Sequence, residues 1–125
     1  IQTFKMMLVP HQGSWQESNI VRIAEEFSAQ PLVIYQGIHG GTLPKSNSLL
    51  SVDAPNVVVT SVKNAEDNDD LIVRCVELAG KASSANLKFG FNDKQWSGSF
   101  TPSEIKTLRV NRKSGTIKEV NLLEE

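Results

Sequence analysis

Residue types that form covalent cross-links and metal sites are scarce in this sequence. Cys75 is the single cysteine among 125 residues, which excludes a disulfide within the chain. The two histidines, His11 and His39, lie far apart and make no recognisable zinc-binding spacing with it. Because the neighbours of Cys75 are mostly apolar and typical of a strand, we expect a small buried hydrophobic residue there and no metal site in this chain.

Long hydrophobic runs and an excess of one charge are also missing. No apolar run approaches the ~20 residues that a membrane-spanning helix needs, so we expect no membrane partner. The 13 basic and 14 acidic residues leave a net charge of −1, which gives no electrostatic case for binding nucleic acid. With one cysteine and no Asn-x-Ser/Thr motif, we expect a cytoplasmic location.

The length and composition are those of one soluble domain. A chain of 125 residues can bury one core, and 39% hydrophobic residues are ordinary for a globular protein. We therefore predict a single domain over residues 1–125. Its first residues already have the pattern of a strand, so we expect the chain to be a piece of a longer polypeptide.

The clearest element is a hairpin between Asn56 and Gly80. An apolar, β-branched run begins at Val57, an acidic tip follows over residues 66–70, and a second strand-like run covers Leu71 to Leu78. Part of each strand is apolar on both faces, which predicts strands at the centre of a sheet that is covered on both sides. If Arg74 on the second strand is buried, it must find a carboxylate or carbonyl partner, for which Glu77 and Glu104 are candidates.

One helix is expected near the N-terminus. Ser14 and Glu17 have the spacing of a capping box, and apolar residues then recur at helical intervals, so we predict a helix from about Ser14 to about Ser28. Pro31 follows and cannot continue it.

The other segments alternate between short strands and turns. We predict strands at residues 3–9, 32–35, 48–52 and 84–91, loops at 36–47 and 92–102, and a closing hairpin formed by residues 104–110 and 116–123. The fold class is therefore mainly β, an antiparallel β-sandwich, immunoglobulin-like or related, with one α-helix near the N-terminus.

Six residues are candidates for binding or for an interface with another domain: His11, Trp15, His39, Gly40, Gly41 and Trp96. Each has a structural alternative. His11 can be a hydrogen-bonded structural residue, the loop of His39 and the two glycines can be simply flexible, and the tryptophans can pack in the core or at its rim. No catalytic residue is assigned, because no nucleophile elbow occurs. The acidic tip lacks the pattern of a calcium-binding loop, so a solvated tip is expected there.

Several motifs, taken in order, resemble one protein family. They are FKMMLVPHQGSW from Phe4 to Trp15, QPL from Gln30, SLL from Ser48, the hairpin from Asn56 to Gly80, and EIKTL from Glu104. This set is similar to the C-terminal β-sandwich of glycoside hydrolase family 38 α-mannosidases, most closely to the cytosolic and bacterial branch. The similarity covers essentially the whole chain.

The resemblance implies a role beside an enzyme. The parent protein would be a zinc-dependent retaining α-mannosidase that acts on mannose-containing glycans, with the zinc and the catalytic carboxylates in a separate catalytic domain. This chain would be inactive alone and would pack on the catalytic and other domains of the same polypeptide. Two alternatives remain open, a carbohydrate-binding module and an immunoglobulin-like interaction domain without an enzyme.

Overall fold

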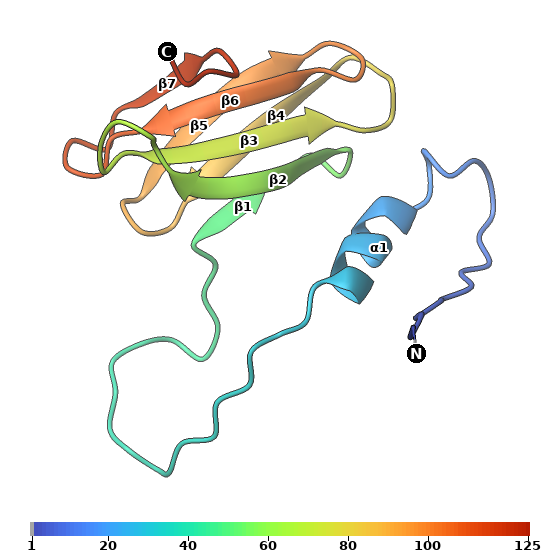
Figure 1. Ribbon diagram of the computed structural model, residues 1–125, viewed down its shortest axis with the longest axis horizontal. Helices are drawn as coiled ribbons and strands as arrows, with labels where there is room; N and C mark the ends of the chain where they lie inside the picture. The colour runs from blue at the N-terminus through green and yellow to red at the C-terminus, as the bar shows by residue number, and fades with distance from the viewer. Residues whose placement is uncertain (1) are drawn as a thin grey trace. The chain divides into compact units, whose positions relative to one another are not determined.

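The computed structural model describes residues 2–125. The chain divides into two compact units, one that ends at Tyr35 and one over Gln36–Glu125. All the strands belong to the second unit, from green to red in Figure 1. The single domain expected over residues 1–125 stays a prediction.

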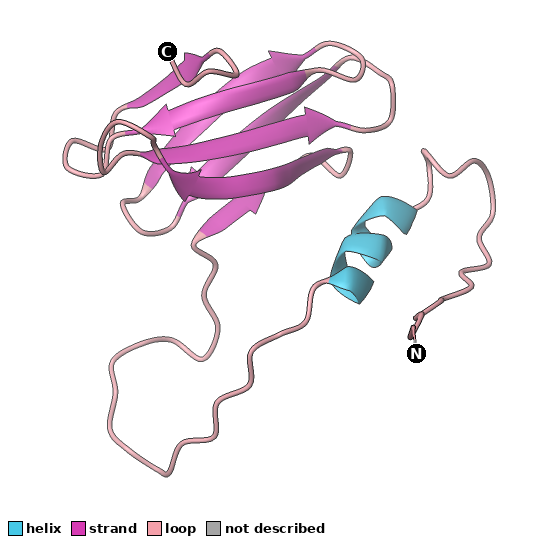
Figure 2. Cartoon of the chain, in the orientation of Figure 1, coloured by secondary structure: helices cyan, strands magenta, loops and turns pink. Residues whose placement is uncertain are grey.

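The first unit contains α1, Ile20–Ser28, the one helix among the residues described (Figure 2). A helix near the N-terminus is confirmed, but its predicted start at Ser14 is wrong. The capping box forms only a local turn, in which the Ser14 N–H donates to Glu17 Oε2 at 3.2 Å and the Glu17 N–H donates to the Ser14 carbonyl at 3.1 Å. The helix begins later, after Asn19, which gives it no side-chain cap.

The strands predicted at residues 3–9 and 32–35 are wrong. Both segments are irregular, and their large apolar side chains are exposed, Met6 by 93% and Tyr35 by 96%. Alternation and β-branched composition give a segment the tendency to extend, but a strand also needs a neighbour for its backbone N–H and C=O groups. The described residues provide no such neighbour for either segment.

The second unit is an antiparallel β-sandwich, as predicted. One sheet has the order β1-β4-β5 and the other has the order β2-β3-β6-β7. The bounds are as follows: β1 Leu50–Val52, β2 Val57–Asn64, β3 Leu71–Glu77, β4 Ser83–Phe89, β5 Lys94–Phe100, β6 Ile105–Val110 and β7 Ile117–Val120. The chain passes between the sheets after β1, β3 and β5, so each sheet combines strands that are distant in sequence.

The hairpin of β2 and β3 is confirmed, but only β3 has the central position expected for both strands. It lies between β2 and β6, and its Ile72, Val73 and Cys75 are 0% exposed. β2 is an edge strand, which leaves Val62 53% exposed. A bulge between Val59 and Ser61 adds one residue to β2 and shifts its register against β3.

The loop predicted over residues 92–102 is wrong, because most of it forms β5. This strand pairs with β4 along its whole length, from Phe89 opposite Lys94 to Ser83 opposite Phe100. Small and polar residues between Trp96 and Phe100 conceal the alternation. Gly98 has a specific role, since a Cβ there would lie 2.3 Å from the Trp96 ring that covers it.

The closing hairpin is confirmed with a shorter last strand. Its loop turns at Gly115, whose φ of +72° favours glycine. The Asn111 side-chain oxygen accepts hydrogen bonds from the backbone N–H groups of Lys113 and Ser114 at 3.1 and 2.8 Å. β7 is an edge strand and carries Lys118 and Glu119, charges of the kind that discourage further pairing.

Both sheets supply the core. Its buried members are Val57, Val73, Cys75, Ala85, Leu87, Phe89, Phe100, Leu108 and Val110. Each large side chain of this kind contributes about 1.5–3 kcal/mol when it is removed from water. The buried position expected for Cys75 is confirmed, and burial raises the pKa of its thiol to about 11.

Candidate functional site

Two of the sequence candidates, His11 and Trp15, lie in the first unit. His11 is exposed, and its Nδ1 is 3.4 Å from the carbonyl oxygen of Gln12. Trp15 is 49% exposed, and its carbonyl accepts a hydrogen bond from the Ser18 hydroxyl at 3.0 Å. Both residues belong to the turn that precedes α1, and a binding role for them stays a prediction.

Three further candidates, His39, Gly40 and Gly41, lie in the irregular segment between Tyr35 and β1. The His39 ring bonds within its own loop: Nδ1 lies 2.9 Å from the Gly40 carbonyl oxygen and Nε2 lies 2.9 Å from Gln36 Oε1. A Cβ at either glycine would meet nothing within 4 Å. These contacts keep the His39 ring within its own loop, and an interface role for the loop stays a prediction.

The sixth candidate, Trp96, lies on β5 and packs against the core. Its ring centroid is 6.1 Å from that of Phe100, with the ring planes at 81°, an edge-to-face contact. No hydrogen bond or aromatic contact among the described residues joins it to the His39 loop. Within the second unit, the structure therefore does not join Trp96 to the His39 loop.

A buried carboxylate that the sequence interpretation did not single out as a site belongs to Glu77, at the end of β3. Its side chain is 1% exposed. The Asn56 amide and the Ala79 N–H donate to Oε1 at 2.8 and 2.7 Å, and the Lys81 and Ser103 N–H groups donate to Oε2 at 3.2 and 2.9 Å. Burial raises the pKa of this carboxyl, but these hydrogen bonds outweigh it and bring the pKa down to about 2. Glu77 is therefore a fixed anion that joins three loops.

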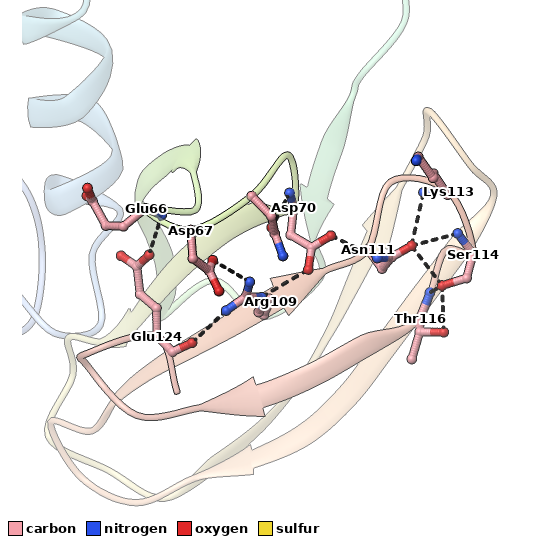
Figure 3. Close-up of polar contacts among 10 residues, drawn as sticks. Glu66, Asp67, Asp70, Arg109, Asn111, Lys113, Ser114, Thr116 and Glu124 are labelled. Atoms are coloured by element: carbon pink, nitrogen blue, oxygen red, sulfur yellow. Dashed lines mark hydrogen bonds and ion pairs between the residues drawn. The ribbon is translucent and has the colours of Figure 1, made fainter.

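A group of charged residues covers the face of the four-stranded sheet that points away from the core. We call it the outer-face network, and its members are Lys63, Asp67, Asp70, Arg74, Arg109 and Glu124. At its centre, Arg109 donates to Asp70 Oδ2 at 3.0 Å, to Asp67 Oδ1 at 2.5 Å and to the backbone carbonyl of Glu124 at 3.0 Å (Figure 3). The acidic tip is therefore held to β6 by an arginine, in addition to facing water.

The C-terminal turn completes this network from the other side. Glu124 is 7% exposed, and its Oε1 lies 2.7 Å from Lys63 Nζ and 3.3 Å from Arg74 Nη2. Arg74 also donates to the Leu122 carbonyl at 3.0 Å. The expected partners of Arg74, Glu77 and Glu104, are thus wrong: Glu77 is on the opposite face of β3 and Glu104 pairs with Lys106. Local sequence could not identify Glu124, which is 50 positions away.

These charged groups are paired with one another. Among the residues that the structure describes, no group of three or more His, Cys, Asp or Glu side chains is placed to hold a metal ion. Over the same residues, no helix has the length and apolar character to span a membrane. The hydrogen bonds and ion pairs of Glu77 and of the outer-face network hold loops and strands together.

An apolar groove of about 400 Å³ opens between the two sheets of the sandwich. The three-stranded sheet contributes Leu50 and Phe89, the four-stranded sheet contributes Val62 and Leu71, and Leu49 and Phe91 come from just outside the strands. Arg112, from the loop between β6 and β7, contributes the one charged side chain. Gly90 shapes this end of the sandwich, because a Cβ there would lie 2.3 Å from the Ser48 carbonyl oxygen.

Comparison with known proteins identifies the sandwich. The model of the family described as glycosyl hydrolases family 38 C-terminal beta sandwich domain matches residues 56–125, which is more than half of the chain and includes β2 to β7. No curated protein and no solved structure gives a match. The family resemblance is therefore confirmed, with its motifs from Asn56 onward inside the matched range: this chain belongs to the family of glycosyl hydrolase family 38 C-terminal β-sandwich domains.

Proposed function

We propose that this chain is the non-catalytic C-terminal domain of a zinc-dependent retaining α-mannosidase, and that it packs on the catalytic domain of the same polypeptide and supports it. The observation that carries the proposal is the family match over residues 56–125. A C-terminal domain of a family 38 enzyme functions in association with other domains of its polypeptide.

The environment of the acidic side chains favours a structural, non-catalytic role for this chain. A general acid in glycoside hydrolysis needs a raised pKa, and a retaining enzyme needs two carboxyl groups about 5 Å apart at the scissile bond. The pKa of Glu77 is instead lowered to about 2, and its four hydrogen bonds fix both oxygens. Asp70 and Glu124 are paired with Arg109 and Lys63. We therefore assign zinc, nucleophile and acid/base group to the catalytic domain.

The test is a comparison of this chain with the natural polypeptide that contains it. We expect no turnover of 4-nitrophenyl α-mannoside by the chain alone, with or without added zinc, and turnover by the whole polypeptide. Zinc-dependent turnover by the chain alone would refute the proposal. So would a whole polypeptide that carries no catalytic domain.

A carbohydrate-binding module is the less well supported alternative. Such a module needs exposed aromatic rings as a platform for sugar rings. Trp96 packs against the core and is covered on one side by Gly98 and Phe100, so its ring cannot serve as an open platform. A titration with mannose oligosaccharides that shifts tryptophan fluorescence would favour this alternative over ours.

The cytoplasm is the compartment that we propose. The support is the single cysteine together with the lack of an Asn-x-Ser/Thr motif in this sequence. Fractionation of cells that produce the natural polypeptide, followed by detection with an antibody against this domain, tests the assignment, and recovery in the secreted fraction would contradict it.

A further inference from the structure

The surfaces of the sandwich differ in how completely they are covered by its own residues. Part of the outer face of the four-stranded sheet is covered by the C-terminal turn, whose Glu124 binds Lys63 and Arg74. The groove between the sheets has no such cover. Its lining side chains Leu49, Val62 and Phe91 are 67%, 53% and 43% exposed.

Such an exposed apolar lining is costly in water. Removal of apolar surface from water is favourable in proportion to its area, so an apolar side chain that fills this groove stabilises the association. Exposed apolar patches of this kind mark interaction sites on otherwise polar domains.

The charge at the rim of the groove indicates the chemistry of that partner. The chain has four arginines, and Arg22, Arg74 and Arg109 each pair with a carboxylate. Arg112 bonds only to a neutral group among the residues described, donating to Asn64 Oδ1 at 2.5 Å. A guanidinium has five N–H donors, so Arg112 retains donors for an anion next to the apolar lining.

We propose that this groove is the surface through which the domain docks on the rest of its own polypeptide, and that the docked segment inserts an apolar side chain next to a carboxylate that pairs with Arg112. The inference rests on the proposed function, since it names the face and the partner chemistry of that association. Five of the seven lining residues, from Val62 onward, lie inside the range that matches the family.

Substitutions at two positions whose side chains are equally exposed provide a direct test. Val62 lines the groove, and Ile105 lies on the outer face of the same sheet; both are β-branched and both are 53% exposed. In the chain alone, Val62→Glu and Ile105→Glu should have similar, small effects on the thermal midpoint. In the whole polypeptide, Val62→Glu should separate the unfolding of this domain from that of the rest, whereas Ile105→Glu should leave one transition.

Reversing the charge of Arg112 tests whether the docked segment carries a carboxylate that pairs with it. Arg112→Glu should weaken the association in the whole polypeptide, with about a tenfold faster cleavage at the domain junction by a protease, while Lys113→Glu in the same loop should not. Equal cleavage of the two variants would overturn the predicted carboxylate, because both change the net charge by the same amount.

Hydrogen exchange distinguishes failure of this inference from failure of the proposed function. We expect the amides of Val62, Leu71 and Phe91 to exchange more slowly in the whole polypeptide than in the chain alone. Protection near Ile105 without protection of the groove would overturn the inference and leave the proposed function intact. No protection on either surface would contradict both. A dimer of the chain alone that Val62→Glu dissociates would show that the occupant is a second copy and overturn the inference.

Discussion

The side chain of Glu77 contributes to the response of the sandwich to acid. Its pKa in the folded state is lowered to about 2, below the ordinary value of 4.5. Its stabilisation is therefore fully present above about pH 4.5 and is lost as the pH falls toward 2. A difference of this size corresponds to about 3 kcal/mol of folding free energy.

The variant Glu77→Gln tests this contribution. An amide has only one acceptor oxygen, so its NH₂ group would face N–H donors at the end of β3, at a cost of roughly 2–4 kcal/mol at neutral pH. Chemical denaturation at several pH values should show a smaller free energy of unfolding and a flatter dependence between pH 2 and 5. Glu25→Gln, on the exposed part of α1, is the control. An unchanged slope for Glu77→Gln would contradict the assignment.

The backbone at Gly90 allows close approach of another segment. The nearest atom to an added Cβ is the Ser48 carbonyl oxygen at 2.3 Å, a backbone atom that cannot rotate away. Gly90→Ala should therefore displace the start of β1 and destabilise the fold by about 1–3 kcal/mol. Gly40→Ala, where a Cβ meets nothing within 4 Å, should change the free energy of unfolding by less than about 0.5 kcal/mol. Equal effects of the two variants would show that the close approach is unimportant.

At the scale of elements, the sequence predicts a strand well where its apolar residues are clearly set apart from polar or charged ones. The hairpin of β2 and β3 is an example, because its apolar runs are separated by an acidic tip. β5 is the opposite case: Trp96 and Phe100 mark one face, but serine and glycine occupy the positions between them. At residues 3–9 and 32–35 the sequence pattern is strong, yet no strand forms, because pairing depends on a partner that a local pattern does not encode.

The C-terminal turn is held in part by the side chain of Glu124. Hydrogen bonding to Lys63 is the largest effect on Glu124 and lowers the pKa of its carboxyl. Because the folded-state pKa is lowered, the stabilisation is present above the ordinary value of 4.5 and is lost as the pH falls through the folded value.

Glu124→Gln should consequently lower the thermal midpoint at neutral pH and in low salt, and the loss should shrink at 1 M salt, where partly exposed ion pairs are screened. Glu125→Gln, one position further, is the matched control and should leave the midpoint unchanged. A loss of equal size at low pH, where the carboxyl is protonated, would contradict the ionic explanation.

At the scale of the whole molecule, composition and alternation are sufficient to predict a β-sandwich, but the sites depend on contacts between distant residues. Arg74 shows the difference. Its need for a partner follows from its place on an apolar strand, but the partner, Glu124, comes from a turn that only the folded sheet brings near. The groove likewise joins Leu49, Phe91 and Arg112 from three segments that no local pattern connects.

The unfolding of the whole sandwich can be followed through Cys75. This thiol is 0% exposed at the centre of the four-stranded sheet, and burial raises its pKa to about 11, so it is both inaccessible and protonated at neutral pH. A local opening at β7, which does not pair with β3, does not remove a strand next to it. Labelling with a thiol reagent should therefore require global unfolding, with a rate that rises with denaturant as steeply as the equilibrium unfolding does. Complete labelling within seconds is expected in 6 M guanidinium. Comparably fast labelling in native buffer would mean that β3 separates from its neighbours without loss of the core.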